Sequence, residues 1–164
     1  MATTNSETFQ ISTPSDHEFV ITRAFNAPRE LVWDACTKPE HIQKWWGCNE
    51  SEMTVCQNDL RVGGAWRFVL QMPGGGELGF NGVFREVSPH ERLVRTSVYE
   101  PMPQYPSLVT LVLEERDGKT LMTETTRHET IEARDGHLHS GLEGGARQSL
   151  DRLEEYVASL TPVG

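Results

Sequence analysis

Three glycines, Gly74, Gly76 and Gly79, follow the spacing of a dinucleotide-binding motif, Gly-x-Gly-x-x-Gly. Such a motif binds a pyrophosphate where a helix follows it, because the phosphate sits at the N-terminus of that helix. Here the following segment, Leu78–Val87, alternates apolar and polar residues and so predicts a strand. We therefore interpret the motif as the tip of a hairpin and expect no nucleotide cofactor.

A group of histidines, His137 and His139 with His128 nearby, could bind a metal ion. A zinc site needs three or four ligands, which usually include cysteine or carboxylate partners at suitable spacing. The sequence places no such partners beside these histidines, and their segment predicts a polar loop that leads into a helix. We expect surface histidines here, with no metal and no other cofactor.

Nucleophilic catalysis has no recognisable signature in this chain. It has no Gly-x-Ser-x-Gly, and no serine or cysteine has a base beside it in sequence. Because catalytic groups also assemble from distant positions, we name the residues that could serve as acids or bases inside a pocket. They are His41, Arg95, Tyr99, Glu124 and His128. We expect hydrogen-bonding or surface roles for them, assign no catalytic residue, and favour a protein that is not an enzyme.

The net charge of the chain limits the partners that we expect, and its cysteines indicate the cellular compartment. Asp and Glu outnumber Lys and Arg 24 to 15, for a net charge of -9. An acidic surface repels phosphate backbones and anionic lipid heads, so we expect neither nucleic acid nor membrane as a partner. No apolar run is long enough to span a bilayer. The three cysteines, Cys36, Cys48 and Cys56, form no Cys-x-x-Cys, and the N-terminus lacks a secretory signal, which together favour the reducing cytoplasm.

The length suits one domain. Residues 1–17, rich in Thr and Ser, predict a flexible lead-in, and residues 18–164 predict the folded domain. Glu18–Phe25 alternates as a strand does, with Phe19, Ile21 and Arg23 on one face. Prolines are favoured at the first position of a helix, so the sequence predicts two short helices, one over Pro28–Cys36 and one from Pro39 to Trp45 or Trp46.

Six further strands follow in the sequence pattern, separated by short turns rich in Gly and Pro. They are Ser51–Gln57, Ala65–Met72, Leu78–Val87, Arg92–Glu100, Leu108–Arg116 and Thr120–His128. Asp117-Gly118 between the last two is a strong hairpin signal. Connections this short require antiparallel neighbours, so we expect a meander with the first strand added at one edge.

The last segment, Asp135–Leu160, has apolar residues at steps of three and four and predicts one long amphipathic helix. The apolar face of the sheet must be covered, and only this helix is long enough to do so. The fold class is therefore α+β: a curved antiparallel sheet of about seven strands wrapped around a long C-terminal helix. The exposed sheet edge makes a homodimer plausible.

We expect a pocket between the sheet and this helix, because aromatic residues are concentrated between residues 33 and 99 of the domain. Adjacent residues on a helix point about 100° apart, so Trp45 and Trp46 cannot both be core, and one should lie near the pocket mouth. Gly141, Gly144 and Gly145 near the start of the helix each cost about 1 kcal/mol relative to alanine. They indicate either a helix end that opens to admit a ligand or a regular helix that starts only near Arg147.

Five blocks of the chain also resemble one protein family. They are RAFNAPRELVW at residues 23–33, PEHIQKWWG at 39–47, DLRVGGAWRF at 59–68, GVFREV at 82–87 with PHERLV at 89–94, and SLDRL at 149–153. The family comprises bacterial proteins similar to the C-terminal domain of the Aha-type activator of the Hsp90 ATPase. It is part of the START-like (SRPBCC, helix-grip, Bet v-like) superfamily.

The resemblance implies a helix-grip fold with a pocket for a hydrophobic ligand such as a lipid, a polyketide or an aromatic molecule. Many family members carry Gly-Trp in the long helix, whereas this chain has Gly141-Leu142 and Gly145-Ala146, so ligands of relatives do not transfer directly. The leading hypothesis is a small-molecule-binding domain. The alternatives are a chaperone-activating interaction module, weakened because the chain lacks the extra domain of eukaryotic activators, and a polyketide cyclase- or hydrolase-like enzyme.

We expect ten residues to line the pocket, from the short helices, the strands and the face of the long helix. They are Trp33, Trp46, Trp66, Phe68, Phe84, Tyr99, Leu142, Gly145, Ala146 and Ser149.

Overall fold

The computed structural model describes residues 8–47 and 50–160. The strands are β1 (Gln10–Ser15), β2 (Glu18–Phe25), β3 (Glu52–Asn58), β4 (Ala65–Gln71), β5 (Glu77–Ser88), β6 (Arg92–Tyr99), β7 (Ser107–Arg116) and β8 (Lys119–His128). The helices are α1 (Arg29–Thr37), α2 (Pro39–Trp45), α3 (Ile131–Leu138) and α4 (Leu142–Leu160). Within the described residues, no helix is long and apolar enough to cross a membrane.

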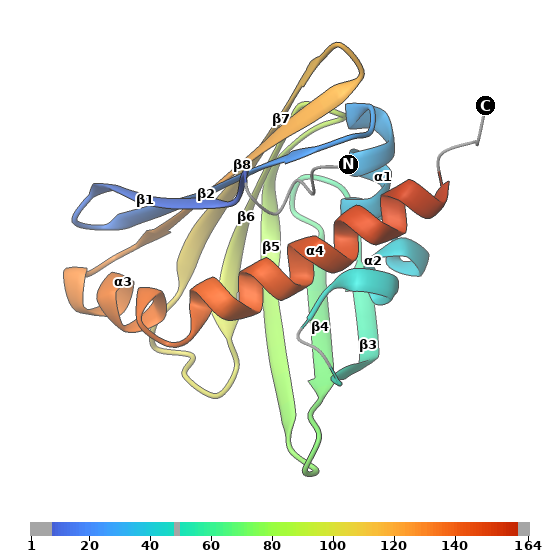
Figure 1. The fold of residues 1–164 in the computed structure, drawn as a ribbon. Helices are drawn as coiled ribbons and strands as arrows, with labels where there is room; N and C mark the ends of the chain where they lie inside the picture. The colour runs from blue at the N-terminus through green and yellow to red at the C-terminus, as the bar shows by residue number, and fades with distance from the viewer. Residues whose placement is uncertain (1–7, 48–49, 161–164) are drawn as a thin grey trace.

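The strands form one antiparallel sheet in the order β1-β2-β8-β7-β6-β5-β4-β3. The sheet curves, and α4 runs diagonally across one face of it with α1 and α2 at one end and α3 at the other (Figure 1). This arrangement confirms the predicted α+β helix-grip fold. Its edges are β1 and β3, and a homodimer through either edge stays a prediction.

The sheet has one strand more than the sequence indicated. Gln10–Ser15 of the expected lead-in forms β1, which pairs antiparallel with β2. The first predicted strand, β2, is added at the β8 edge of the meander as expected, but β1 pairs on its other side, so β2 is not the edge of the sheet. β1 consists mainly of Thr, Ser and Pro and has no alternation of apolar and polar residues that would predict a strand. It is a strand because its backbone pairs with β2.

The final helix is not continuous from Asp135. The structure has α3 at Ile131–Leu138, then a break, then α4 from Leu142. The Thr130 hydroxyl caps α3 by accepting from the amide of Ala133, and Gly141 turns the chain at a φ of 85°. Positive φ favours glycine, so this residue separates the helices. The alternative that the regular helix starts near Arg147 is also wrong, since Gly144 and Gly145 lie within α4.

The strand periodicity elsewhere matches the structure. Asp117 and Gly118 both have positive φ (54° and 75°), as a two-residue hairpin turn requires, and they join β7 to β8. The dinucleotide-like glycines lie in the β4–β5 hairpin, where Gly74 also has a positive φ and no helix follows. This confirms their interpretation as a hairpin tip.

One part of the core lies where β2 and the C-terminal half of α4 meet α1. Phe25, Val32, Leu153 and Val157 are almost fully buried there. On this side α4 packs closely on α1 and α2, and not as closely on any strand. In the N-terminal half of α4, Leu142 and Ala146 pack against the core but are only partly buried.

An ion pair joins the sheet to α4 at the packed end. Arg23 of β2 is completely buried, as its predicted inward orientation requires, and its guanidinium donates to Asp151 at 2.5 Å and to Glu154 at 2.9 Å. A buried cation needs such partners because its removal from water is costly. The pair therefore fixes the position of α4 relative to β2.

Candidate functional site

The candidate site is the inner face of β4, β5 and β6 together with the side of α4 that faces it. Successive side chains of a strand alternate between faces, so the inward positions are Trp66 and Phe68 on β4, Phe80 and Phe84 on β5, and Arg95 and Tyr99 on β6. The register supports this, since Phe68 pairs with Phe80 and Phe80 with Tyr99.

Five aromatic rings form a continuous chain across this face. Trp66 contacts Phe68 with ring centroids 4.9 Å apart, and Phe68 contacts Trp46 at 5.1 Å. Trp46 in turn contacts Phe80 at 5.1 Å, and Phe80 contacts Tyr99 at 5.2 Å. Trp66 and Phe68 are fully buried, whereas Trp46, Phe80 and Tyr99 are only partly buried. One end of the aromatic chain is therefore core, and the other retains accessible apolar surface.

The orientation of Trp66 depends on a glycine in the next strand. Its indole lies across Gly82 and donates from Nε1 to the carbonyl oxygen of Thr96, two strands away, at 3.0 Å. A Cβ on Gly82 would meet that oxygen at 1.8 Å and the indole nitrogen at 2.6 Å. Only glycine allows this close approach, so the indole is held flat against the sheet as one wall of the site.

The predicted α4 residues Leu142, Gly145, Ala146 and Ser149 share the helical face of the buried Leu150, yet all four are partly exposed. Ser149 has a structural contact, because its hydroxyl accepts from the amide of Gly47 at 3.2 Å. That bond ties α4 to the segment after α2. Leu142, Gly145 and Ala146 are the α4 positions whose inward surface is left incompletely covered.

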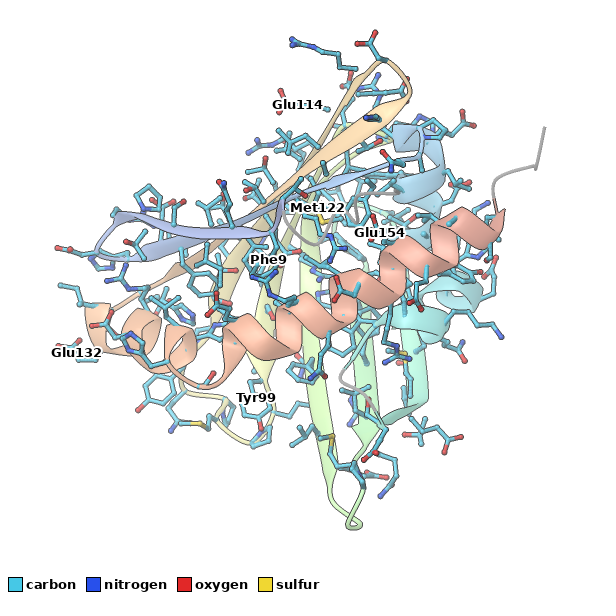
Figure 2. The ribbon with its side chains drawn as sticks, in the orientation of Figure 1. Phe9, Tyr99, Glu114, Met122, Glu132 and Glu154 are labelled. Carbon is cyan, nitrogen blue, oxygen red and sulfur yellow. The ribbon has the colours of Figure 1, made fainter. Side chains whose placement is uncertain are left out.

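Besides Trp66 and Phe68, two more predicted pocket residues are part of the packed core. Trp33 is buried on α1, where its ring meets that of His90 at a centroid distance of 6.2 Å, away from the aromatic chain. Phe84 shares the inner face of β5 but is 1% exposed. Tyr99, by contrast, lies at the end of β6 on the opposite side of α4 from Phe9 and Met122 (Figure 2).

A charged group lies behind the aromatic chain. The guanidinium carbon of Arg95 is 4.5 Å from the centroid of the Trp66 ring and 6.0 Å from that of Phe68. Glu124 of β8 and Cys36 of α1 are close enough for their charges to affect Arg95. Among the residues that the structure describes, neither the Arg95 guanidinium nor the Glu124 carboxylate has a hydrogen-bond or ion-pair partner. Both side chains nevertheless keep some accessible surface.

Burial shifts the pKa values of Arg95, Glu124 and Cys36. It lowers the pKa of Arg95, against the opposing charges of Glu124 and Cys36. It raises the pKa of Glu124, against the opposing charge of Arg95. It also raises the pKa of the Cys36 thiol to about 12, with a further rise from Glu124 that Arg95 opposes. The thiol is therefore protonated at neutral pH and is a poor nucleophile, because the thiolate is the reactive form.

A surface pocket of about 490 Å³ lies on the outer side of Trp46. It is lined by Glu40, Gln43, Lys44, Trp46, Ser51, Glu52, Met53 and Arg152. Trp46 contacts Phe68 and Phe80 on one side and borders this polar pocket on the other. This confirms that one residue of the Trp45-Trp46 pair is core and the other is not, since Trp45 is 7% exposed.

The remaining acid–base candidates lie elsewhere. His41 on α2 is hydrogen-bonded to the hydroxyl of Tyr156 on α4. His128 is buried, and its Nε2 lies 2.9 Å from Nδ1 of His137, whose ring packs edge-on against Phe19. His137 and His128 therefore connect α3 to the sheet, and they do not lie among the site residues described above.

Sequence reasoning missed two residues of this region, Phe80 and Cys36, and it missed the burial of Phe9 outside the region. Phe80 is an inward aromatic of the same strand as Phe84, and alternation alone could have identified it. Cys36 is next to Arg95 and Glu124 only through the tertiary structure. Phe9 precedes β1, is 6% exposed, and lies between β2 and α4 with the Arg147 guanidinium 4.4 Å from its ring centroid (Figure 2). Its position in the polar N-terminal segment gave no sign of this.

Comparisons with known proteins agree with the fold. The family described as Activator of Hsp90 ATPase homolog 1-like protein matches residues 26–158. A crystal structure from Rhodobacter sphaeroides is 28% identical with a TM-score of 0.86, covering 93% of this chain and 99% of that one. One from Nitrosomonas europaea is 28% identical with a TM-score of 0.81, covering 90% and 98%. One from Mycobacterium smegmatis, at 22% identity, has a TM-score of 0.80 and covers 93% and 98%. None of the curated proteins matches the chain.

Proposed function

The chain belongs to the family of Activator of Hsp90 ATPase homolog 1-like proteins, and on that basis we propose that it binds a small, largely apolar molecule between α4 and strands β4, β5 and β6. The observation that carries the proposal is the incomplete burial of side chains that face each other across this region. Phe80 and Tyr99 from the sheet, and Leu142 and Ala146 from α4, all retain accessible surface although they point inward.

Burial differs along α4. At the α1 end, facing residues such as Phe25 and Val157 bury almost all of their surface. Protein interiors are normally as dense as organic crystals, so apolar surface left uncovered inside a fold is costly. A bound apolar molecule would cover that surface, and the burial of apolar surface would contribute favourably to the free energy of binding.

The lining indicates the class of ligand. Small-molecule sites are mostly apolar and aromatic, with a few polar groups that orient the ligand. Here the walls are Trp46, Phe68, Phe80 and Tyr99, and ring–ring contacts of this kind favour a flat or aromatic molecule. An aromatic or polyketide-like molecule fits this lining better than a saturated lipid chain does.

Two routes could admit a ligand. The first is past Trp46, which borders the surface pocket and also contacts Phe68 and Phe80. The second is the start of α4, where Gly144 and Gly145 weaken the helix and where a Cβ on either residue would meet nothing within 4 Å. Replacing Trp46 by Ala should speed association in the first case only, as stopped-flow fluorescence would show.

The experiment that tests the proposal is a binding screen with a blocking variant. Flavonoids, polyketides and fatty acids are titrated by calorimetry into the wild type, into Ala146→Phe and into Glu155→Phe. Ala146 faces inward on α4, whereas Glu155 is exposed. We expect at least one compound to bind the wild type and Glu155→Phe with similar affinity and Ala146→Phe at least tenfold more weakly.

Two results would contradict the proposed binding. If no compound binds, or if Ala146→Phe unfolds at a much lower denaturant concentration than the wild type, the region is filled by protein and the proposal fails. Mass spectrometry of the recovered ligand distinguishes binding from conversion, because an enzyme would return a product. The family description also names a chaperone ATPase activator, and stimulation of Hsp90 ATP turnover by the whole chain would establish that alternative instead.

A further inference from the structure

Arg95 and Glu124 place two titratable groups at the site, and within the described residues neither has a hydrogen-bond or ion-pair partner. Arg95 points inward from β6, and its guanidinium stacks on the Trp66 ring at 4.5 Å. Glu124 points inward from β8, where it pairs in register with Leu111 and Ile21, both buried residues of the same inner face. β7 lies between β6 and β8, and Arg95 and Glu124 form no salt bridge. Each group nevertheless affects the pKa of the other through its charge.

Interior charges without partners are rare in proteins because desolvation is costly. The contrast with Arg23 is direct, since that buried guanidinium has two carboxylates at hydrogen-bond distance. Arg95 and Glu124 lie on strands that are separated by β7 and form no hydrogen bond with each other. The N–H groups of Arg95 are therefore available to a molecule that enters the site.

Building on the proposed function, we propose that Arg95 and Glu124 recognise an acidic oxygen on an aromatic ligand, a carboxylate or a phenolate, with Arg95 as the main donor. The ring of the ligand occupies the space next to Trp46, Phe68 and Phe80, and its acidic oxygen points toward β6. The ligand class is thus an aromatic acid or phenol, and not a neutral hydrocarbon or an amine.

The residues around Arg95 hold its guanidinium in a position to bind an acidic oxygen. One face of the guanidinium rests on an indole that is itself fixed by its bond to Thr96, so the position of the cation is set before a ligand arrives. Charge-assisted hydrogen bonds to a guanidinium are stronger and more directional than neutral ones. Burial favours the protonated form of Glu124, and a protonated carboxyl can donate to the same oxygen. Cys36 is uncharged and adds no competing charge.

The test uses four probes with the same ring system: 2-naphthoate, 2-naphthol, naphthalene and 2-naphthylmethylammonium. Each is titrated by calorimetry at neutral pH into the wild type, Arg95→Met, Glu124→Gln and the control Arg85→Met. Methionine has the length to cover Trp66, and Arg85 is an exposed arginine on the outer face of β5. Glu124→Gln retains a donor at that position and should bind 2-naphthoate within about threefold of the wild type.

We expect the wild type to bind 2-naphthoate at least tenfold more tightly than naphthalene, with 2-naphthol between them and the ammonium probe weakest. A hydrogen bond to a charged group supports a difference of this size. Arg95→Met should lose this preference while its naphthalene affinity changes by less than about threefold, and Arg85→Met should keep the preference.

Failure of the inference can be told apart from failure of the proposed function. Equal affinities for 2-naphthoate and naphthalene, tighter binding of the ammonium probe, or an unchanged preference in Arg95→Met would overturn the inference but leave apolar binding intact. Absence of binding by all four probes would overturn both. If Arg95→Met does not fold, the ranking of the four probes by the wild type still decides the question.

Discussion

The Arg95 guanidinium lies over the face of the Trp66 ring, 4.5 Å from its centroid, and its charge has no carboxylate partner within the described part of the chain. A cation over an indole gains about 0.5–2 kcal/mol. An enclosed cation without an ion pair loses more than that through desolvation. The arrangement is thus a net cost to the fold, as is common at sites that serve binding.

This relationship predicts that Arg95→Met stabilises the empty protein. The methionine should still pack on Trp66 while the desolvation cost disappears, so we expect the free energy of unfolding to rise by about 1 kcal/mol. Urea unfolding measures it. The exposed control Arg85→Met should change stability by less than about 0.5 kcal/mol. A clear loss of stability in Arg95→Met would mean that Arg95 has a structural role instead.

Gly82→Ala should be among the most destabilising substitutions in the sheet. Its Cβ would lie 1.8 Å from the Thr96 carbonyl oxygen and 2.6 Å from the Trp66 indole nitrogen, so the indole must leave its place. We expect a loss of about 3 kcal/mol or more, with a change in tryptophan fluorescence. Gly76→Ala is the matched control, because a Cβ there meets nothing within 4 Å. Similar effects in the two variants would contradict the close approach.

Arg23→Met tests the attachment of α4 to β2. The Arg23 side chain is fully buried, whereas Asp151 and Glu154 are 44% and 23% exposed, so water can solvate the carboxylates once the cation is lost. We therefore expect a loss of about 2 kcal/mol, at the low end for a broken buried pair. Arg61→Met removes an exposed pair with Asp59 and should cost less than about 0.5 kcal/mol. Equal losses would show that Arg23 contributes no more than a surface charge.

Gly144→Ala and Gly145→Ala should each stabilise α4. Both residues lie inside the helix, a methyl group added at either position would meet no atom within 4 Å, and alanine is favoured over glycine there by about 1 kcal/mol. Thermal unfolding would show the gain. If the start of α4 must open to admit a ligand, the double variant should also bind and release the ligand more slowly. Faster exchange in the stabilised variant would exclude that route.

Acid should weaken the contact between α3 and the sheet. Burial and the neighbouring His128 lower the pKa of His137 from 6.5 to about 4. The unfolded chain therefore binds more protons than the folded one in this interval, so stability is complete above about pH 6.5 and falls as the pH drops toward 4. Urea unfolding at several pH values would show a smaller fall for His137→Gln. The exposed His139→Gln should behave as the wild type does.

The order of elements could be predicted from residue patterns because each pattern is local. Alternation marked the strands from β2 to β8, proline and glycine marked the ends of α1 and α2, and Asp117-Gly118 marked a turn. β1 and the break between α3 and α4 could not be predicted in the same way. β1 depends on backbone pairing with β2, and α3 has no fully buried residue to give it a hydrophobic pattern.

The sequence by itself determined the helix-grip architecture and the aromatic inner face, since the period of a strand decides which side chains share a face. Only the tertiary structure decided which of those aromatics are core and which are accessible, because that depends on how far α4 lies from each strand. It also decided the partners of the two inward arginines. Arg23 meets two carboxylates from α4. Arg95 stacks on the Trp66 indole, and Glu124 affects its pKa without an ion pair to it.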